Sequence, residues 1–463
     1  MKSQFWSRAV ILVAICLFIL SSETRSQWTL TPADSLSYEK AKNDTAKLSQ
    51  MASVHRGDRV GAKAQNRLGW LAYLNKKPEI AQQKFASTYS LYPNRPESFE
   101  AAYFLGVVTD KSDKFEEAKR NLQVYVANNP NDGDVDYWEY LIIRAMSETN
   151  DSNFIPSAHT YLRSKHVSQE WNPTLQNELA RFSFETGDFL NTLVEAQKVI
   201  DNYPNSKYVR YAEGDILESN IALGNSQVAL DFANTLLSKY GLNNDDAARA
   251  QLNIASIYEN RGDLDRARSE YSKVVNLHPS TTYRVAAAEY SLIMIDLRQA
   301  RERNDNAALK SAAKDLKEFV SNHPKDHSAP RALMSIADLA AQNGKVQDAI
   351  DAYNAIIQYV DSLVVGKNIS RLSPDLKGLR ELAIQAHMFK GVLLRVQMKN
   401  SRSALAEFDY LVGVNQNNTA ALLNKAMCLI DIGRKREARI ILQQLVDKQT
   451  DLKDAASQLL KTI

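Results

Sequence analysis

The sequence predicts an all-α protein built as a row of helical hairpins. Glycine and proline, the residues that interrupt helices, are scarce at 16 and 12 of 463 residues. Long stretches are rich in Ala, Leu, Glu, Lys, Gln and Arg, which have high helix propensity. A pattern of small, bulky and turn residues also recurs about every 34 residues, and such a period indicates a repeat architecture.

The first 26 residues have the order of a secretory signal peptide. Lys2 and Arg8 precede an uninterrupted apolar run, Ala9–Leu20, and small polar residues follow it. We therefore predict that residues 1–26 are a signal peptide, that cleavage follows Ser26, and that the protein is exported.

Two alternatives for this segment stay open. A membrane anchor would need roughly 20 apolar residues to span a bilayer, and Ala9–Leu20 is shorter. Lipidation of Cys16 would need a small residue before the cysteine, where the sequence has Ile15. The signal peptide is favoured, with Cys16 as part of its apolar run.

The composition of the mature chain argues against two classes of partner. Cleavage would remove three basic residues and one acidic residue, which lowers the formal charge from +3 to about +1. A near-neutral chain with interspersed charges is not expected to bind nucleic acid or an anionic membrane surface. Cys428 would be the one remaining cysteine, so we expect no internal disulfide and a thiol that packs as a small apolar group.

The clearest copy of the repeat is Leu252–Pro279. Two amphipathic runs are separated by the turn residues Arg261–Asp263, and Pro279 prevents the second run from continuing. The residues that define the two helical faces are Ile254, Ala255, Tyr258, Ala267, Tyr271 and Val274. The copy therefore predicts one hairpin of two helices.

The same pattern recurs along most of the chain. Marker residues of the other copies are Leu68, Gly69, Ala81, Phe85 and Pro93; Leu105, Gly106, Ala118, Leu122 and Pro130; Leu179, Ala180, Gly187, Ala196 and Pro204; Ile216, Gly224, Ala229 and Ala233; Ile336, Ala337, Gly344, Ala349 and Tyr353; and Ala426, Gly433, Ala438 and Leu442. Small residues let the two helices approach, and the bulky residue of the second helix fills the space between hairpins. Stretches near 139–172, 285–325 and 385–417 match less well and carry insertions.

This combination resembles the tetratricopeptide repeat family, with about ten units over residues 62–450. The resemblance implies a right-handed superhelix, an α-solenoid, whose first helices line a concave groove. It also implies a non-enzymatic protein that binds other proteins. The alternative is an irregular helical bundle, which the repeated pattern disfavours.

The ends and connections follow from the repeat. We expect a capping helix within 27–61, with Thr31 as its N-cap and Pro32 in its first position. The N-terminal part of the array would cover 62–360, a connecting loop 361–381, and the C-terminal part with its closing helix 382–463. A stacked array needs such caps because each unit contacts its neighbours alone.

A finer similarity lies in Tyr203–Asn225. A "YPNS" turn followed by a fresh helix is similar to exported bacterial repeat proteins of the outer-membrane assembly and Tol–Pal coordinator type. Together with the signal peptide, this similarity implies a periplasmic or envelope-associated protein. It also implies that the protein belongs to an outer-membrane or peptidoglycan-associated complex.

Motifs for catalysis, cofactors and metals are not found, so we predict no enzyme activity, no cofactor and no metal site. His323 and His327 are four residues apart, but Pro324 lies between them, so helical metal-ligand spacing is not expected. The Arg-Gly-Asp triplets at Arg56–Asp58 and Arg261–Asp263 are interpreted as chance occurrences, the second of them in a hairpin turn. Glu97 faintly resembles the acid of helical lytic transglycosylases, whose downstream glycine-rich motif is absent here.

The remaining candidate is the groove. In the family pattern, the second, fifth, ninth and twelfth positions of each unit point inward. In the N-terminal half this predicts a protein-binding strip of Trp70, Tyr73, Tyr103, Phe184 and Tyr211, since aromatic residues are favoured at binding hot spots. Later units place Arg249, Glu259, Arg331 and Asp338 there. The alternative is that these aromatic residues pack as core between units.

These observations favour a scaffold or adaptor in the cell envelope that binds protein segments in its groove. Two alternatives remain. An accessory domain of an envelope enzyme predicts a pocket with clustered carboxylates of perturbed titration. A purely architectural spacer predicts no exposed binding surface.

Overall fold

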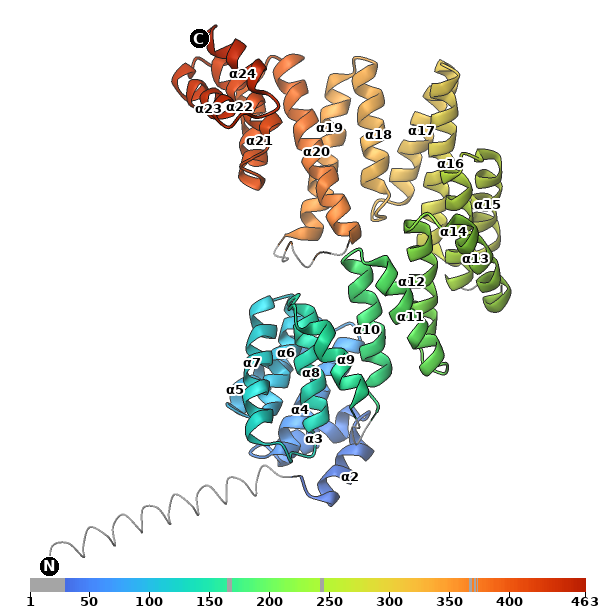
Figure 1. The fold of residues 1–463 in the computed structure, drawn as a ribbon, viewed down its shortest axis with the longest axis vertical. Helices are drawn as coiled ribbons and strands as arrows, with labels where there is room; N and C mark the ends of the chain where they lie inside the picture. The colour runs from blue at the N-terminus through green and yellow to red at the C-terminus, as the bar shows by residue number, and fades with distance from the viewer. Residues whose placement is uncertain (1–29, 165–168, 242–244, 366–368, 370–371, 373) are drawn as a thin grey trace, which may run out of the picture. The chain divides into compact units, whose positions relative to one another are not determined.

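The computed structural model describes residues 30–164, 169–241, 245–365, 369, 372 and 374–463. The helices in this part of the chain run from α2 to α24, with no strand among the described residues, which confirms the predicted all-α class (Figure 1). The chain divides into two compact units, unit 1 up to Glu213 and unit 2 from Gly214. The predicted signal peptide, residues 1–26, lies outside the described residues.

Unit 1 contains the helices up to the first turn of α12, and the boundary between the units falls within that helix. Their bounds are α2 (Pro32–Ala41), α3 (Thr45–Val54), α4 (Arg59–Leu74), α5 (Pro78–Leu91), α6 (Pro96–Thr109), α7 (Ser112–Asn128), α8 (Val135–Glu148), α9 (Phe154–Arg163), α10 (Asn172–Glu185), α11 (Phe189–Asn202) and α12 (Val209–Ala222).

Unit 2 contains the rest of α12 and the helices that follow it. Their bounds are α13 (Ser226–Tyr240), α14 (Asp245–Asn260), α15 (Leu264–Leu277), α16 (Thr282–Glu302), α17 (Asn306–Asn322), α18 (Ala329–Gln342), α19 (Val346–Val364), α20 (Pro374–Val396), α21 (Ser401–Val414), α22 (Thr419–Asp431), α23 (Lys435–Asp447) and α24 (Lys453–Leu460). Within the described residues, no helix combines the length and hydropathy needed to cross a membrane.

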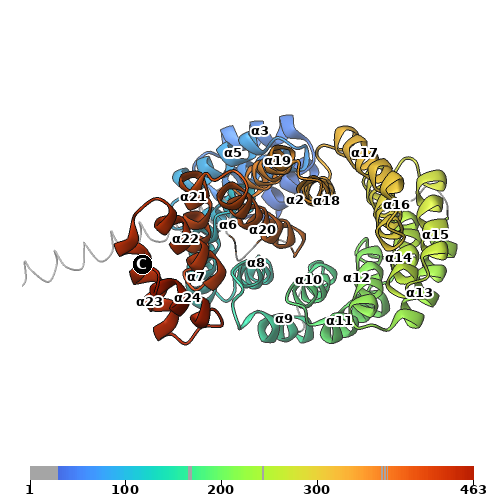
Figure 2. The same ribbon diagram turned by 90° about the horizontal axis from the view of Figure 1, so that it is seen from above.

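Consecutive helices pair as hairpins from α4 with α5 to α22 with α23, including α12 and α13, whose residues Leu217 and Ala229 share one core cluster. This arrangement agrees with the about ten units that the sequence predicts. The first helices of successive hairpins also contact one another, as α4 with α6, α6 with α8, and α8 with α10. In Figure 2, α8 and α10 lie on one side of this row, and α9 and α11 lie on the other. We call the surface of α4, α6, α8 and α10 the first-helix face of unit 1.

The hairpin turns form for local reasons. Gly262 has φ +78°, which L side chains rarely adopt, so glycine permits the reversal after α14. Asp263 then caps α15, since its side chain accepts a hydrogen bond from the backbone N–H of Arg266. The Arg-Gly-Asp triplet at 261–263 is therefore a turn, as predicted.

Close helix packing depends on glycine facing phenylalanine. A Cβ atom on Gly69 would lie 2.8 Å from the ring of Phe85, which is fully buried between the helices of its hairpin. Gly391 and Phe408 repeat this arrangement, again with a closest approach of 2.8 Å. The small residue of the first helix thus accommodates the bulky residue of the second, which is the packing inferred from the sequence.

The N-terminal end differs from the prediction of a single capping helix. Thr31 caps α2 and Pro32 begins it, as predicted. The helix is interrupted before Asp44, and a second helix, α3, begins after it. Asp44 caps α3, because its side chain accepts hydrogen bonds from the backbone N–H groups of Ala46 and Lys47. The array is therefore preceded by a helical hairpin.

The weakly matching stretches correspond to irregular hairpins. Helix α9 has 10 residues, whereas α16 has 21 and α20 has 23. In the predicted connection 361–381, α19 ends at Val364 and α20 begins at Pro374. Cys428 is buried in the core of the last hairpins, as expected, and burial raises the pKa of its thiol to about 11.

Candidate functional site

Trp70 and Tyr73 form an aromatic pair on α4. Their ring centroids lie 5.5 Å apart with an interplanar angle of 25°, so the rings are stacked. Tyr73 is 37% exposed and Trp70 is half-buried against Phe104 of α6. The two residues predicted for the first unit therefore lie together and present accessible aromatic surface.

Tyr103 is buried on α6, with an exposed fraction of 3%. Its ring packs edge-on against Phe104 and Phe115, at centroid distances of 5.3 and 5.2 Å. Helix α8 packs against α6, so this position of the first helix is enclosed by the next repeat. Tyr103 therefore belongs to the core, the alternative that the sequence left open, and is not available to a partner.

Phe184 and Tyr211 lie apart from the pair on α4. Phe184, at the end of α10, packs edge-on against Phe189 at 5.6 Å. Tyr211, on α12, is 45% exposed and lies beneath the guanidinium of Arg210, 4.9 Å from its ring centroid. Among the described residues no aromatic contact connects either ring to Trp70 or Tyr73.

A second aromatic cluster, which the sequence analysis did not identify, consists of Tyr137, Tyr140 and Trp171. The ring of Trp171 lies 5.0 Å from Tyr137 and 4.9 Å from Tyr140, stacked on the latter. Tyr137 and Trp171 are partly exposed, whereas Tyr140 is 6% exposed. The available signal was the three-residue spacing of the two tyrosines on α8, which puts both on one helical face.

A carboxylate, Glu100 of α6, lies between the first helices of three successive hairpins. Its Oε1 accepts a hydrogen bond from the hydroxyl of Tyr137 at 2.7 Å, and its Oε2 accepts one from the Asn66 amide at 2.8 Å. Withdrawal from water raises the pKa of Glu100 to about 7, against the lowering effect of these hydrogen bonds.

A buried ion network centred on Arg59 supports this part of the face. Arg59 is 5% exposed, and its Nε donates to Glu97 of α6 at 2.6 Å. Its terminal nitrogens donate to Asp132 and Asp134, before α8, at 2.9 to 3.1 Å. Glu97 is fully buried and paired, so it is not a free acid of the transglycosylase kind.

Lys63 is held in the same network. Its Nζ lies 2.6 Å from the carboxylate of Asp134. Asn66 is 3% exposed and donates to the backbone oxygen of Glu97 as well as to Glu100. Lys63 and Asn66 are thus engaged within the chain.

The histidines that sequence spacing raised as metal ligands have other partners. His323 lies 2.8 Å from Glu289, and His327 contacts Asp375. In the described part of the chain, no group of three or more His, Cys, Asp or Glu side chains could hold a metal ion.

The polar first-helix positions of unit 2 mostly make contacts within the chain. Arg249 lies 3.1 Å from Asp246, and Arg331 lies 2.9 Å from Asp375. Glu259 accepts a hydrogen bond from the Tyr271 hydroxyl at 2.7 Å. These residues stabilise the repeats themselves.

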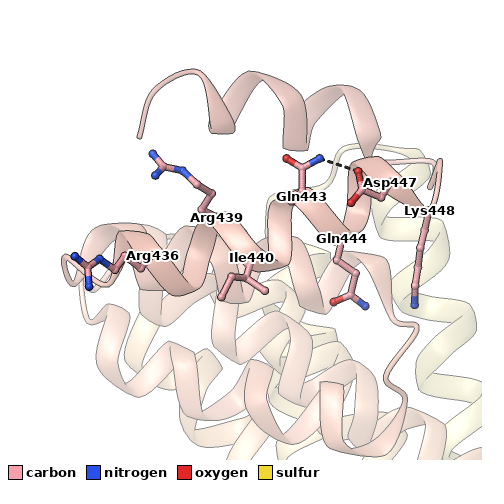
Figure 3. A pocket seen from close by; sticks show the side chains of 7 residues that line it. All are labelled: Arg436, Arg439, Ile440, Gln443, Gln444, Asp447 and Lys448. Atoms are coloured by element: carbon pink, nitrogen blue, oxygen red, sulfur yellow. Dashed lines mark hydrogen bonds between the residues drawn. The ribbon is translucent and has the colours of Figure 1, made fainter.

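Unit 2 also has two surface hollows near its C-terminal end. One, of about 820 Å³, runs along the exposed side of α23 and is lined by Arg436, Arg439, Ile440, Gln443, Gln444, Asp447 and Lys448 (Figure 3). Gln443 donates to Asp447 at 2.7 Å there. The other, of about 560 Å³, lies at the turn between α20 and α21.

Models of known protein families match several stretches of the repeat array. Tetratricopeptide repeat models match residues 249–281, 297–360 and 420–451. The chain therefore contains tetratricopeptide repeats at these residues. Residues 62–230 of this repeat protein match the outer membrane lipoprotein family YfiO, a stretch that covers the first-helix face of unit 1 except for the first three residues of α4. A search of the curated proteins finds no match.

Solved structures that are similar to this repeat protein match it at low sequence identity and low TM-score. A tetratricopeptide repeat protein from Parabacteroides merdae is 15% identical over 62% of this chain and 97% of its own, with a TM-score of 0.31. The human IFIT1 dimer with m7Gppp-AAAA is 12% identical over 89% and 95%, with a TM-score of 0.39. A Rap protein complexed with Competence and Sporulation Factor is 12% identical over 78% and 99%, with a TM-score of 0.37. At these scores the likeness carries no functional argument.

Proposed function

We propose that this repeat protein is a non-catalytic adaptor of the cell envelope, which binds a segment of a partner protein on the first-helix face of unit 1. The observation that carries the proposal is the accessible stacked pair of Trp70 and Tyr73 on α4. Rigid aromatic side chains supply a large contact area at low entropic cost, and they dominate binding hot spots.

The surroundings of the pair support a preformed surface. The Arg59 network links α4 to α6 and to the start of α8 through buried ion pairs. The partly exposed rings of Tyr137 and Trp171 add aromatic surface on α8 and at the residue before α10. A surface fixed in this way loses little conformational entropy when a partner binds.

The envelope location rests on two further observations. The match to an outer membrane lipoprotein family covers this face, and residues 1–26 have the order of a signal peptide. The partner would therefore be a protein of the envelope, in an outer-membrane or peptidoglycan-associated complex.

The enzyme alternative would use the neighbouring carboxyls Glu97 and Glu100. Glu97 is fully buried and held by Arg59 at 2.6 Å, so it cannot exchange protons with a bound substrate. Glu100 alone, with one hydrogen bond on each oxygen, does not make an acid–base pair. The adaptor is the better supported function.

Site-specific photo-cross-linking in the native envelope tests the proposal. A photoreactive phenylalanine analogue would replace Tyr73 on α4 or, as matched controls, Ile80 on α5 and Val124 on α7, which are 44% and 59% exposed. We expect a discrete partner to be captured from position 73 and not from positions 80 and 124. Equal capture at all three positions would refute the site, and capture at none would favour the spacer.

A further inference from the structure

The Glu100 carboxylate lacks a cationic partner in the part of the chain that the structure describes. Tyr137 and Asn66 each donate one hydrogen bond to it, and no Lys, Arg or His side chain pairs with it. Each carboxylate oxygen can accept a second hydrogen bond. Glu100 is partly exposed as a residue, which is the access that an incoming group needs.

The nearest basic groups are committed elsewhere. Lys63 is paired with Asp134 at 2.6 Å, and Arg59 is paired with Glu97 and Asp132 at 2.6 and 2.9 Å. The network itself has two basic groups, Arg59 and Lys63, and three acidic partners, so it has no spare cation for Glu100. When it is ionised, Glu100 therefore adds to the first-helix face a negative charge that no ion pair within the described residues compensates.

Aromatic rings adjoin this carboxylate. Tyr137, whose hydroxyl donates to Glu100, packs against Trp171 with a ring centroid distance of 5.0 Å, and both rings are partly exposed. Tyr38 of α2 lies close enough for the Glu100 charge to raise the pKa of its phenol, second to the effect of burial. The faces of such rings attract cations, which adds to the attraction of a carboxylate.

We propose that Glu100, with the adjoining rings of Tyr137 and Trp171, binds a lysine or arginine side chain of the partner segment. The inference rests on the proposed function and specifies the chemistry of its partner. A cation would supply the missing charge for Glu100 and donate to its free acceptor sites. The apolar part of a long basic side chain would lie along the aromatic rings.

Binding of a cation should depend on pH. Burial holds the pKa of Glu100 near neutrality, so an arriving cation must compete with a proton. The other groups near Glu100 are Glu97 and Lys63, each in an ion pair, and the neutral side chains of Tyr38, Tyr137 and Asn66. Affinity for a cationic segment should therefore rise between pH 6 and pH 8.

Three blocked pentapeptides test this site on the purified full mature chain. Their sequences are acetyl-Ala-Ala-Xaa-Ala-Ala-amide, with lysine, norleucine or glutamate in the centre. Binding is followed by NMR of ¹³C-labelled glutamate carboxyls, with the Glu100 signal assigned from E100Q. We expect the lysine peptide to bind about tenfold more tightly than the norleucine peptide at pH 8, and we expect this ratio of affinities to be smaller at pH 6.

Variants isolate the role of Glu100. E100Q should remove the preference for lysine, whereas E116Q, which removes the same charge from the exposed surface of α7, should keep it. Equal binding of the lysine and norleucine peptides, or an intact preference in E100Q, would overturn the inference. If no peptide binds while cross-linking from position 73 persists, the cation site fails and the adaptor stands. Loss of both results refutes both proposals.

Discussion

The side-chain amide of Asn66 donates a hydrogen bond to the carboxylate of Glu100 at 2.8 Å, which joins the first helices of two neighbouring repeats. Asn66 is buried and its position is also fixed by the backbone oxygen of Glu97. The amide can hold Glu100 in place but cannot neutralise it. The structure thus retains an acidic group on the first-helix face at a cost in stability, since partial desolvation disfavours a charge.

Replacing Glu100 with glutamine should stabilise unit 1 most at alkaline pH. The folded-state pKa of about 7 exceeds the ordinary value of 4.5, so the folded chain binds more protons between these values. Stability of the native protein therefore falls as pH rises from 4.5 to 7, and E100Q lacks this loss. We expect E100Q to exceed the native protein by about 1–3 kcal/mol at pH 8 and by less at pH 5.

Amide hydrogen exchange across α4 and α6 measures this difference locally, because repeat arrays need not unfold as one unit. E116Q provides the control for charge removal. If E100Q is more stable than the native protein by the same amount at pH 5 and at pH 8, the result would contradict a raised pKa for Glu100.

Removing the side chain of Arg59 should destabilise the N-terminal repeats. R59A leaves Glu97 fully buried without its guanidinium partner, and burial raises the pKa of that carboxyl despite the attraction of Arg59. Breaking a buried ion pair on one side costs about 3–5 kcal/mol. The check is urea-dependent exchange of the α4 and α6 amides, with the exposed Arg120→Ala as a control that should change little. Equal effects of the two variants would show that the network does not hold the repeats together.

Two glycines of α20 should respond to alanine in opposite directions. In G391A the new Cβ would lie 2.8 Å from the Phe408 ring, so we expect destabilisation of about 1–3 kcal/mol. In G378A no atom lies within 4 Å, so higher helix propensity should stabilise by up to about 1 kcal/mol. Thermal unfolding compares them, and F408L should partly rescue G391A. Destabilisation by G378A as large as that by G391A would exclude the packing explanation.

Buried His278, between α15 and α16, should weaken the fold in mild acid. It is fully buried, and neither ring nitrogen has a hydrogen-bond partner among the described residues. Burial lowers the pKa of its imidazole below the ordinary 6.5. In mild acid the imidazole therefore binds a proton more readily in the unfolded chain than in the folded chain. Stability is therefore lost as pH falls through about 6.5.

The variant H278L tests this loss by comparison with the native protein from pH 8 to pH 5. The native protein should lose more stability over this range, because leucine does not titrate. Parallel stability curves for the two proteins would mean that His278 is protonated, or hydrated, in the folded state.

Local chemistry made most of the fold predictable. The Thr31 cap, the Arg261–Asp263 turn and the contact of Gly69 with Phe85 each depend on residues close in sequence or on one hairpin. The second N-terminal helix was missed because a single aspartate, Asp44, interrupts a stretch without a glycine or proline.

The candidate site was predictable in part. Trp70 and Tyr73 lie one helical turn apart, so their proximity follows from the sequence. The burial of Tyr103 depends on how α8 packs against α6, which helical periodicity does not specify. Trp171 lies before α10, beyond the short α9, where the repeat pattern is irregular, so its stacking on Tyr140 required the structure.

Recognition through the first-helix face of unit 1 can be measured as the affinity of the purified mature protein for the partner captured at position 73. Calorimetry would compare the native chain with the W70A/Y73A variant and with I80A/V124A, a pair of exposed residues on second helices. We predict a loss of at least about 30-fold for W70A/Y73A, and less than about threefold for the control pair. Equal affinity of W70A/Y73A and the native chain, with both folded, would contradict recognition through the first-helix face of unit 1.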